Sequence, residues 1–346
     1  MNARSKRMTL QQVAERAGVS APTISKVLNG RPDVSPETRE RVLKVLREEQ
    51  YLPRGASSLP MAHIHIELVF DALVTPNNLE ITRGIVEAAS EQGAHVAIST
   101  LPADLDVRPW INELERLGRA GLVIVTARLS ADQQQQLQRA SLPLVLIDPL
   151  SAPDPSLASV GAGNWQGGLT AVQHLLELGH RRIAMLRGRE SVADRARYHG
   201  YVAALAGHGI NVDESLIGSG DFRFEPTVPV ALEILQRPDP PTAVFAANDA
   251  EALAVIEAAR RLGKRVPEDL SVVGFDDNLI ASVSSPRLTT VRQPFVQMGA
   301  VAYRVLTELM AGGESDVARV ELATTLVVRE STTAPRQLVP GRPSPP

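Results

Sequence analysis

Two different patterns of apolar and polar positions divide the chain. Up to about residue 52, apolar residues recur at the three- and four-residue spacing of short amphipathic helices. After about residue 64, short β-rich runs alternate with longer amphipathic stretches. The sequence therefore predicts a small all-α unit followed by a large α/β unit.

Three helices are predicted in the small unit. The first begins at a capping box of Thr9 and Gln12 and ends at Gly18. The second begins after Ser20, and the third opens at Ser35-Pro36, a cap followed by a first-turn proline. Their apolar stripes form the expected core: Leu10, Val13, Ala14, Ala17, Ile24, Val27, Leu28, Val42, Val45 and Leu46.

The large unit is predicted to be doubly wound, with parallel sheets. The expected strands are 64–70, 96–99, 122–125, 144–147, 183–186, 243–246 and 270–275, with helices near 78–92, 108–118 and 131–140. About 270 residues is long for one sheet, so two lobes are expected, with a ligand cleft at the carboxyl ends of the strands. The expected lobes are about 64–160 with 290–318, and about 161–289 with 319–332.

Composition sets the remaining boundaries. Residues 53–63 hold two prolines, one glycine and two serines, which is typical of a linker. Five prolines in the last twelve residues predict a disordered tail over 333–346. The expected organisation is a head over 1–52, a hinge over 53–63 and a body over 64–332.

Charge is distributed unevenly between the two units. Residues 1–60 carry a net charge of +5 and the rest a net of −8, so the head suits a phosphate-bearing partner and the body does not. The chain has no cysteine, and no stretch approaches the roughly 18 apolar residues of a membrane span. The basic, polar start is not typical of a secretory signal. A cytoplasmic protein without a membrane partner, metal or cofactor is expected.

The head contains the spacing of a helix-turn-helix over residues 9–20. Ala14 is small where two helices approach, Gly18 takes the tight turn and Val19 fills the core between the helices. The second helix then projects its outer side chains toward the major groove: Ala21, Pro22, Thr23, Ser25 and Lys26.

At this point the sequence strongly resembles the lactose/galactose repressor (LacI/GalR) family. In the head, the resemblance is carried by residues 12–20, 23–30, 34–39 and 51–53, and in the body by 174–183, 247–249, 266–277 and 286–291. It extends from residue 9 to about 332. It implies a DNA-binding repressor whose body is similar to periplasmic sugar-binding proteins.

The resemblance assigns roles within the head. It places Ala21, Pro22 and Lys26 at base edges, and Lys26 is the expected reader of a guanine edge. Residues that match phosphate-holding positions set the register on DNA: Thr9, Ser20, Thr23, Ser25, Asn29 and Thr38.

The hinge departs from the family pattern. Family hinges form a short helix on the operator and insert a leucine into the minor groove. That leucine matches position 60, which is Pro60 here, with Leu59 before it, and Gly55 weakens any helix. The expected hinge contacts are Arg54, Ser57 and Leu59, with a flexible tether as the alternative.

Polar residues at predicted strand ends form the candidate effector site. Asp148, Asn248 and Asp276 each lie at or just after the end of a strand, and their carboxylates and amides suit the hydroxyls of a polyol. Phe222 and Trp165 are the candidate aromatic faces. The resemblance adds Arg197, which matches the family's ligand-binding arginine. Asp249 is expected to cap a helix, and Asp277 to cap a helix or bridge the lobes.

Several alternatives stay open. The predicted function is a homodimeric repressor that a mono- or oligosaccharide releases from a palindromic DNA operator. A purine or nucleoside effector, or a corepressor, is the alternative within this class, and a free sugar-binding module is the alternative outside it. The adjacent Asp276 and Asp277 raise an enzyme as a further alternative, but neighbouring carboxylates on a strand tip point to different faces. No catalytic residue is therefore predicted.

Overall fold

The computed structural model describes residues 10–28, 34–35, 37–38, 41–42, 45, 64–72, 75–101, 105–312 and 319–336. They fall into two compact units, one before His65 and one that comprises most of the chain after it. The two predicted fold classes, an α-helical head and a two-sheet α/β body, are both confirmed.

The head is built on helices α1 (Leu10–Ala17) and α2 (Ala21–Leu28). Gly18 makes the turn between them at φ 65°, a conformation that suits glycine. Arg41 Nε donates to the Ala17 carbonyl over 3.1 Å and links the following helical segment to α1. The buried core confirms the predicted stripes for Val13, Ala14, Ala17, Ile24, Val27 and Val42. The capping box predicted at Thr9 lies outside the described residues.

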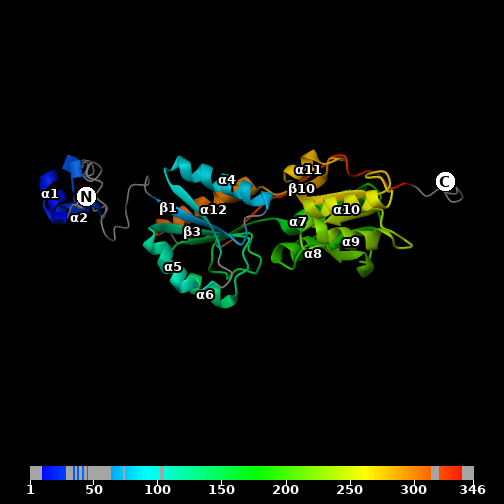
Figure 1. The fold of residues 1–346 in the computed structure, drawn as a ribbon, viewed down its shortest axis with the longest axis horizontal. Helices are drawn as coiled ribbons and strands as arrows, with labels where there is room; N and C mark the ends of the chain where they lie inside the picture. Colours follow the sequence, from blue (N-terminus) through cyan, green and yellow to red (C-terminus); the bar gives the residue numbers. More distant parts are fainter. Residues whose placement is uncertain are drawn as a thin grey trace, which may run out of the picture. The chain divides into compact units, whose positions relative to one another are not determined.

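Lobe 1 of the body contains a six-stranded parallel sheet in the order β11-β5-β4-β3-β1-β2. Its strands are β1 (His65–Phe70), β2 (His95–Thr100), β3 (Arg119–Val125), β4 (Leu144–Ile147), β5 (Ser159–Ala162) and β11 (Arg319–Leu322). Helices α4 (Pro76–Glu91) and α12 (Phe295–Met310) cover one face, and α5 (Val107–Arg116) and α6 (Ala131–Gln138) cover the other (Figure 1).

Lobe 2 contains the second sheet, in the order β12-β10-β9-β8-β6-β7, with β12 antiparallel. Its strands are β6 (Ile183–Arg187), β7 (Ile217–Ser219), β8 (Ala243–Ala246), β9 (Ser271–Asp276), β10 (Thr289–Arg292) and β12 (Thr325–Val327). Helices α7 (Asn164–Glu177) and α8 (Val192–Gly207) pack as one pair, and α9 (Phe224–Leu235) and α10 (Asp249–Arg261) as another. The short helices η2 (Glu214–Leu216) and α11 (Leu279–Val283) complete the lobe.

The central strands β6, β8 and β9 of lobe 2 are buried on both faces, because successive side chains point to opposite faces of the sheet and helices cover each face. Leu186 and Ala246 pack into the cluster that contains the inner faces of α9 and α10. Met185 and Phe245 pack into the cluster of α7 and α8. The continuous apolar runs that predicted buried parallel strands therefore supply two cores to one sheet.

The chain passes between the lobes after β5, after β10 and after β11. This differs from the expected lobe boundaries, because β10 belongs to lobe 2 and β11 to lobe 1. Both strands are short, and periodicity along the chain does not show which sheet a short strand joins. The chain also stays ordered past residue 332: the Thr333 amide donates to Ser271 Oγ over 3.0 Å, and Arg336 pairs with Asp269 at 2.9 Å. The rest of the predicted disordered tail lies outside the described residues.

Candidate functional site

A cavity of about 380 Å³ lies between the lobes of the body. Strands β1, β3 and β4 end level with one another in the parallel register. The residues that follow them, Asp71, Thr126 and Asp148, therefore reach the same edge, and all three line the cavity. The predicted location of the site, at the carboxyl ends of the strands, agrees with this geometry.

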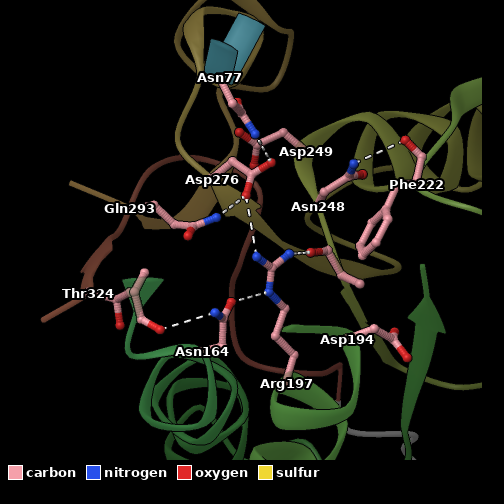
Figure 2. A network of polar contacts seen from close by, with 12 residues as sticks. Asn77, Asn164, Asp194, Arg197, Phe222, Asn248, Asp249, Asp276, Gln293 and Thr324 are labelled. Atoms are coloured by element: carbon pink, nitrogen blue, oxygen red, sulfur yellow. Dashed lines mark hydrogen bonds and ion pairs between the residues drawn. The ribbon is translucent and has the colours of Figure 1, made fainter. Parts of the chain in front are cut away.

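Asp276 is the polar centre of the cavity wall (Figure 2). It is the last residue of β9 and is 5% exposed. Asn77 Nδ2 donates to Asp276 Oδ2 over 2.9 Å, and Gln293 Nε2 donates to Oδ1 over 2.6 Å. Burial raises the pKa of Asp276, while Arg197 and the two amide donors oppose that rise.

Arg197 is held on every side of its guanidinium. Its Nε donates to Asn164 Oδ1 over 2.8 Å, its Nη1 donates to the Ala247 carbonyl over 2.5 Å, and its Nη2 lies 3.8 Å from Asp276 Oδ1. The guanidinium carbon lies 3.8 Å from the centre of the Phe275 ring. Because it is 4% exposed and is held by two hydrogen bonds, an ion pair and a ring contact, Arg197 is preorganised beside the cavity.

Asp148 lies in the electrostatic field of Arg197 and Asp276. Burial raises the pKa of Asp148 to about 6, the nearby Arg197 lowers it, and the carboxylate of Asp276 raises it. A carboxyl with a pKa near 6 changes its charge close to neutral pH. The electrostatics of the cavity are therefore sensitive to small changes in its contents.

Phe222 supplies an aromatic face to the cavity. A Cβ on Gly188 would lie 2.1 Å from the Phe222 ring, so only a glycine leaves room for the ring there. Asn248 Nδ2 donates to the Phe222 carbonyl over 3.1 Å, and the guanidinium of Arg197 lies 5.8 Å from the ring centre. The predicted residues Asp148, Arg197, Phe222, Asn248 and Asp276 thus all line one cavity.

Unusual backbone conformations gather at the same place. Among the described residues other than glycine, six have a positive φ: Thr126, Asp148, Asp221, Phe222, Asp276 and Asp277. All but Asp277 line the cavity. Residues in this conformation cost about 1–3 kcal/mol each and persist where the surrounding structure holds them, which is typical of ligand sites.

The structure corrects two of the expectations for the cleft. Trp165 is 45% exposed and is not part of the cavity lining. It follows Asn164, whose side chain turns inward to Arg197, and successive helical positions point in different directions. The cap of α10 is Asn248, whose Oδ1 accepts from the Glu251 amide over 2.8 Å, and not Asp249.

Asp249 and Asp277, which directly follow the predicted site residues Asn248 and Asp276, bind protein groups instead of lining the cavity. Asp249 is buried and accepts from Thr290 Oγ1 and from the Asn278 amide. Asp277 pairs with Arg292 and Arg329 at 2.6 Å each, away from the partners of Asp276. As expected, the adjacent carboxylates of residues 276 and 277 meet different groups.

Four polar residues of the network were missed from the sequence: Asn77, Asn164, Glu251 and Gln293. Gln293 comes directly after β10, so the rule that selected Asp148 could have found it, whereas Asn77 lies in the first turn of α4, well past the end of β1. Asn164 and Glu251 lie in the first turns of helices, and nothing in the spacing singled them out.

In the head, the structure places part of the predicted DNA-reading surface. Ser20 Oγ accepts from the Thr23 amide over 3.3 Å and lies 2.8 Å from its hydroxyl, so Ser20 caps α2. Pro22 and Lys26, four residues apart on α2, are both exposed, while Ile24 is buried. Thr38 is partly buried and accepts from Ser35 Oγ over 2.9 Å.

The other predicted head and hinge residues cannot be placed in this way. The side chains of Ala21 and Ser25 lie outside the described part of the structure. The same holds for five whole residues: Thr9, Asn29, Arg54, Ser57 and Leu59.

Comparison with known proteins supports both units. The family model of the bacterial regulatory proteins of the lacI family matches residues 9–54, and a periplasmic binding protein-like domain matches 172–332. The HTH-type transcriptional regulator CelR of Thermobifida fusca is 36% identical over 95% of this chain and 99% of its own length. The chain belongs to the LacI family.

Solved structures of this family share the fold. A CelR–cellobiose complex superposes with a TM-score of 0.71 at 35% identity, covering 94% of this chain and all of that one. A lac repressor dimer bound to operator gives a TM-score of 0.72 at 29% identity, covering 95% of this chain and all of that one. Among the helices of the described residues, none is long and apolar enough to cross a membrane.

Proposed function

We propose that this LacI-family chain is a transcriptional repressor whose cleft binds a neutral carbohydrate that releases the head from operator DNA. The observation that carries the proposal is the cluster around Asp276. The side chains of Asn77 and Gln293 donate to this carboxylate, and their carbonyl oxygens are buried without a hydrogen-bond partner among the described residues. A ligand rich in hydroxyl donors would satisfy both oxygens after a small opening of the cleft.

The charges in the lining favour an uncharged ligand. Of the three arginines that line the cavity, Arg197 lies 3.8 Å from Asp276 and Arg189 lies 3.6 Å from Asp71. Their charges are thus partly neutralised by carboxylates. A phosphate or sulfate ester would have to compete with these carboxylates, whereas a neutral polyol would not.

The size of the cavity and its aromatic side suit a sugar. Its volume of about 380 Å³ falls within the range of roughly 300–1,000 Å³ that small-molecule pockets occupy. The Phe222 ring can pack on the apolar C–H face of a pyranose. Because the solved CelR complex is named for cellobiose, a β-linked glucose disaccharide is the first candidate.

For the head, we assign base reading to Ala21, Pro22 and Lys26. The exposed Lys26 is the long polar side chain among them and suits a guanine edge. Ser20, Thr23 and Thr38, with the remaining predicted phosphate contacts, would set the register, and residues 54–59 would contact DNA from the hinge. Two heads on a homodimer would read two half-sites in the cytoplasm, as the lac repressor dimer on its operator illustrates.

A purine or nucleoside remains the second candidate effector. The observation that favours it is Phe222, whose ring could stack on a base, beside Asp276 and two side-chain amides that could bind ring nitrogens. Such a ligand would leave the hydroxyl-accepting groups less completely satisfied. The same ligand could also act as a corepressor and strengthen DNA binding.

The experiment first selects DNA sites for the purified protein from a random-sequence pool. It then measures release from the selected site by cellobiose, xylobiose, glucose, ribose, adenosine and hypoxanthine. We expect a sugar to release the DNA and to raise the melting temperature, with both effects lost in Asp276→Asn and kept in Asp154→Asn, a partly buried control outside the cavity lining. Release by adenosine or hypoxanthine alone would replace the sugar proposal with the second candidate, and tighter DNA binding would reveal a corepressor.

An enzymatic role is not part of this proposal. CelR is named as a regulator, and the carboxylates of Asp276 and Asp277 engage different partners. The check is an assay of the purified protein for hydrolysis of aryl glycosides. Turnover that disappears in Asp276→Asn would contradict a purely regulatory role.

A further inference from the structure

The Phe222 loop is held by the first turn of α10. Asp221 and Phe222 both have a φ of 60°, two consecutive non-glycine residues in a strained conformation. Glu251 Oε1 accepts from the Phe222 amide over 3.0 Å, and Asn248 Nδ2 donates to the Phe222 carbonyl over 3.1 Å (Figure 2 shows the second bond). Two side chains of one helical turn thus hold both backbone polar groups of Phe222.

Glu251 is an unusual residue for this task. It is completely buried, it is not part of the cavity lining, and its second oxygen, Oε2, has no hydrogen-bond partner among the described residues. Burying a carboxyl costs free energy unless it is hydrogen-bonded, and an apolar side chain would fill the same space at no such cost. One oxygen of this carboxyl therefore binds the Phe222 amide, and the other lacks a partner among the described residues.

The charged groups that face Glu251 come from the neighbouring elements of lobe 2. Helix α8 presents Asp194 and Arg197, and Arg187 of β6 is paired with Asp194. Burial, with a smaller contribution from Asp194, raises the pKa of Glu251 to about 8, against the opposing effects of the Phe222 amide and Arg197. The carboxyl is therefore mostly uncharged at neutral pH.

Deprotonation would create a buried charge with one oxygen unsatisfied. Such a charge is stabilised by drawing in water or by moving toward Arg197. Because the Phe222 amide favours the charged form, its bond to Oε1 would strengthen while Oε2 gains water or approaches Arg197, and together these changes would shift the support of a strained loop. The consequence would be felt at the Phe222 ring, which lies in the cavity.

We propose that Glu251 is a positioning residue that fixes the Phe222 ring for the effector through the hydrogen bond it accepts from the Phe222 amide, so that a change at Glu251 alters both the position of the ring and effector binding. This inference rests on the proposed function for its second half, since it takes the cavity to be the effector site. The first half, the coupling between Glu251 and the ring, concerns the protein alone and can be tested without a ligand.

The first test follows the Phe222 ring directly. The full-length protein is labelled with 4-fluorophenylalanine, and the signal of Phe222, one of six phenylalanines, is identified by its loss in Phe222→Leu. Fluorine spectra are then recorded from pH 6 to 9.5. The wild-type Phe222 signal is expected to move with a midpoint near 8, the value to which burial raises the pKa of Glu251.

Three variants separate positioning from general stability. Glu251→Gln keeps the shape and a hydrogen-bond acceptor, so its Phe222 signal should stay constant over this pH range. Glu251→Met fills the space without an acceptor, so its signal should be shifted and constant, and it serves if the glutamine variant does not fold. The control is Glu257→Gln on the same helix, at a partly buried carboxyl that pairs with Arg260 and Arg261, and its Phe222 signal should titrate like that of the wild type.

The inference is overturned if the wild-type Phe222 signal does not move, or if it moves equally in Glu251→Gln. The second test measures cellobiose affinity at pH 7 and pH 9 by calorimetry, where the affinities of the wild type and Glu257→Gln should each differ severalfold between the two pH values and that of Glu251→Gln should not change. An equal change in Glu251→Gln would contradict the effect on binding. If none of the sugars binds at any pH, the proposed effector fails, and the fluorine titration alone decides the role of Glu251.

Discussion

Asn77 donates a hydrogen bond to Asp276 across 2.9 Å, and this bond joins helix α4 of lobe 1 to the end of β9 in lobe 2. Both residues line the cavity, so a contact that holds the lobes together lies where a ligand would bind. Val192 and Leu150 add a backbone hydrogen bond of 3.2 Å between the lobes. Ligand binding and lobe position therefore depend on the same group of residues, which is the physical requirement for coupling them.

Replacing Asn77 with alanine should weaken effector binding. The change removes the amide oxygen proposed to accept from a ligand hydroxyl and also the donor that positions the carboxylate of Asp276, so the affinity should fall roughly tenfold to hundredfold, as losses of about 1.5–3 kcal/mol predict. Calorimetric titration with the releasing sugar measures this. Asn211→Ala, at an exposed position outside the cavity lining, is the control and should bind like the wild type. Unchanged affinity in Asn77→Ala would show that the bond between the lobes plays no part in binding.

Replacing Gly188 with alanine should displace the Phe222 ring. The new Cβ would lie 2.1 Å from the ring, so the ring must move, whereas a Cβ at Gly207 meets nothing within 4 Å. We expect Gly188→Ala to fold with a stability loss of about 1–3 kcal/mol and to lose most of its response to effector. Gly207→Ala should keep the response and be slightly more stable, since alanine favours helix. DNA release and thermal unfolding are measured for both, and a normal response in Gly188→Ala would argue against a ligand at Phe222.

Replacing Lys26 with alanine should relax the sequence preference of the head. If Lys26 reads a guanine edge, its loss should cost about 1–3 kcal/mol on the selected site and reduce discrimination at one base pair of each half-site. Binding to sites with single base changes measures this. A variant that weakens on every sequence equally, with a smaller salt dependence, would instead place Lys26 on a phosphate. The control is Lys264→Ala in the body, which should leave DNA binding unchanged.

Replacing Asp148 with asparagine should change how stability depends on pH. Burial raises the pKa of Asp148 from 3.8 to about 6, so the folded protein keeps this proton longer than the unfolded chain does. Its contribution to stability therefore falls as the pH rises from about 4 to 6 and is constant above that range. The variant lacks this loss, so relative to the wild type it should gain on the order of 2 kcal/mol between pH 4 and pH 7.

Urea unfolding at pH 4 and pH 7 measures the effect of Asp148. Asp154→Asn is the matched control, because hydrogen bonds from Ser156 lower the pKa of Asp154 and its contribution has the opposite sign. Identical pH dependence in Asp148→Asn and the wild type would mean that burial does not raise the pKa of Asp148.

Much of the fold could be predicted because its signals are local. Strands β4 and β8 begin and end where the apolar runs predicted them, at Leu144–Ile147 and Ala243–Ala246. The head motif and its core followed from helical spacing. The lobe boundaries near β10 and β11 could not be predicted in this way, because sheet membership depends on pairing between residues far apart in the chain.

The candidate site also combines features with local signals and features that depend on residues far apart in the chain. The sequence by itself determined that Asp148, Asn248 and Asp276 lie at or next to the carboxyl ends of strands, and these ends meet within each sheet, Asp148 in lobe 1 and the other two in lobe 2. Only the tertiary structure decided that Asn77 and Gln293 hold Asp276, that Trp165 faces away from the cavity and that Glu251 supports Phe222. Those facts depend on side-chain directions and on contacts between elements that are distant in sequence, and neither composition nor spacing carries that information.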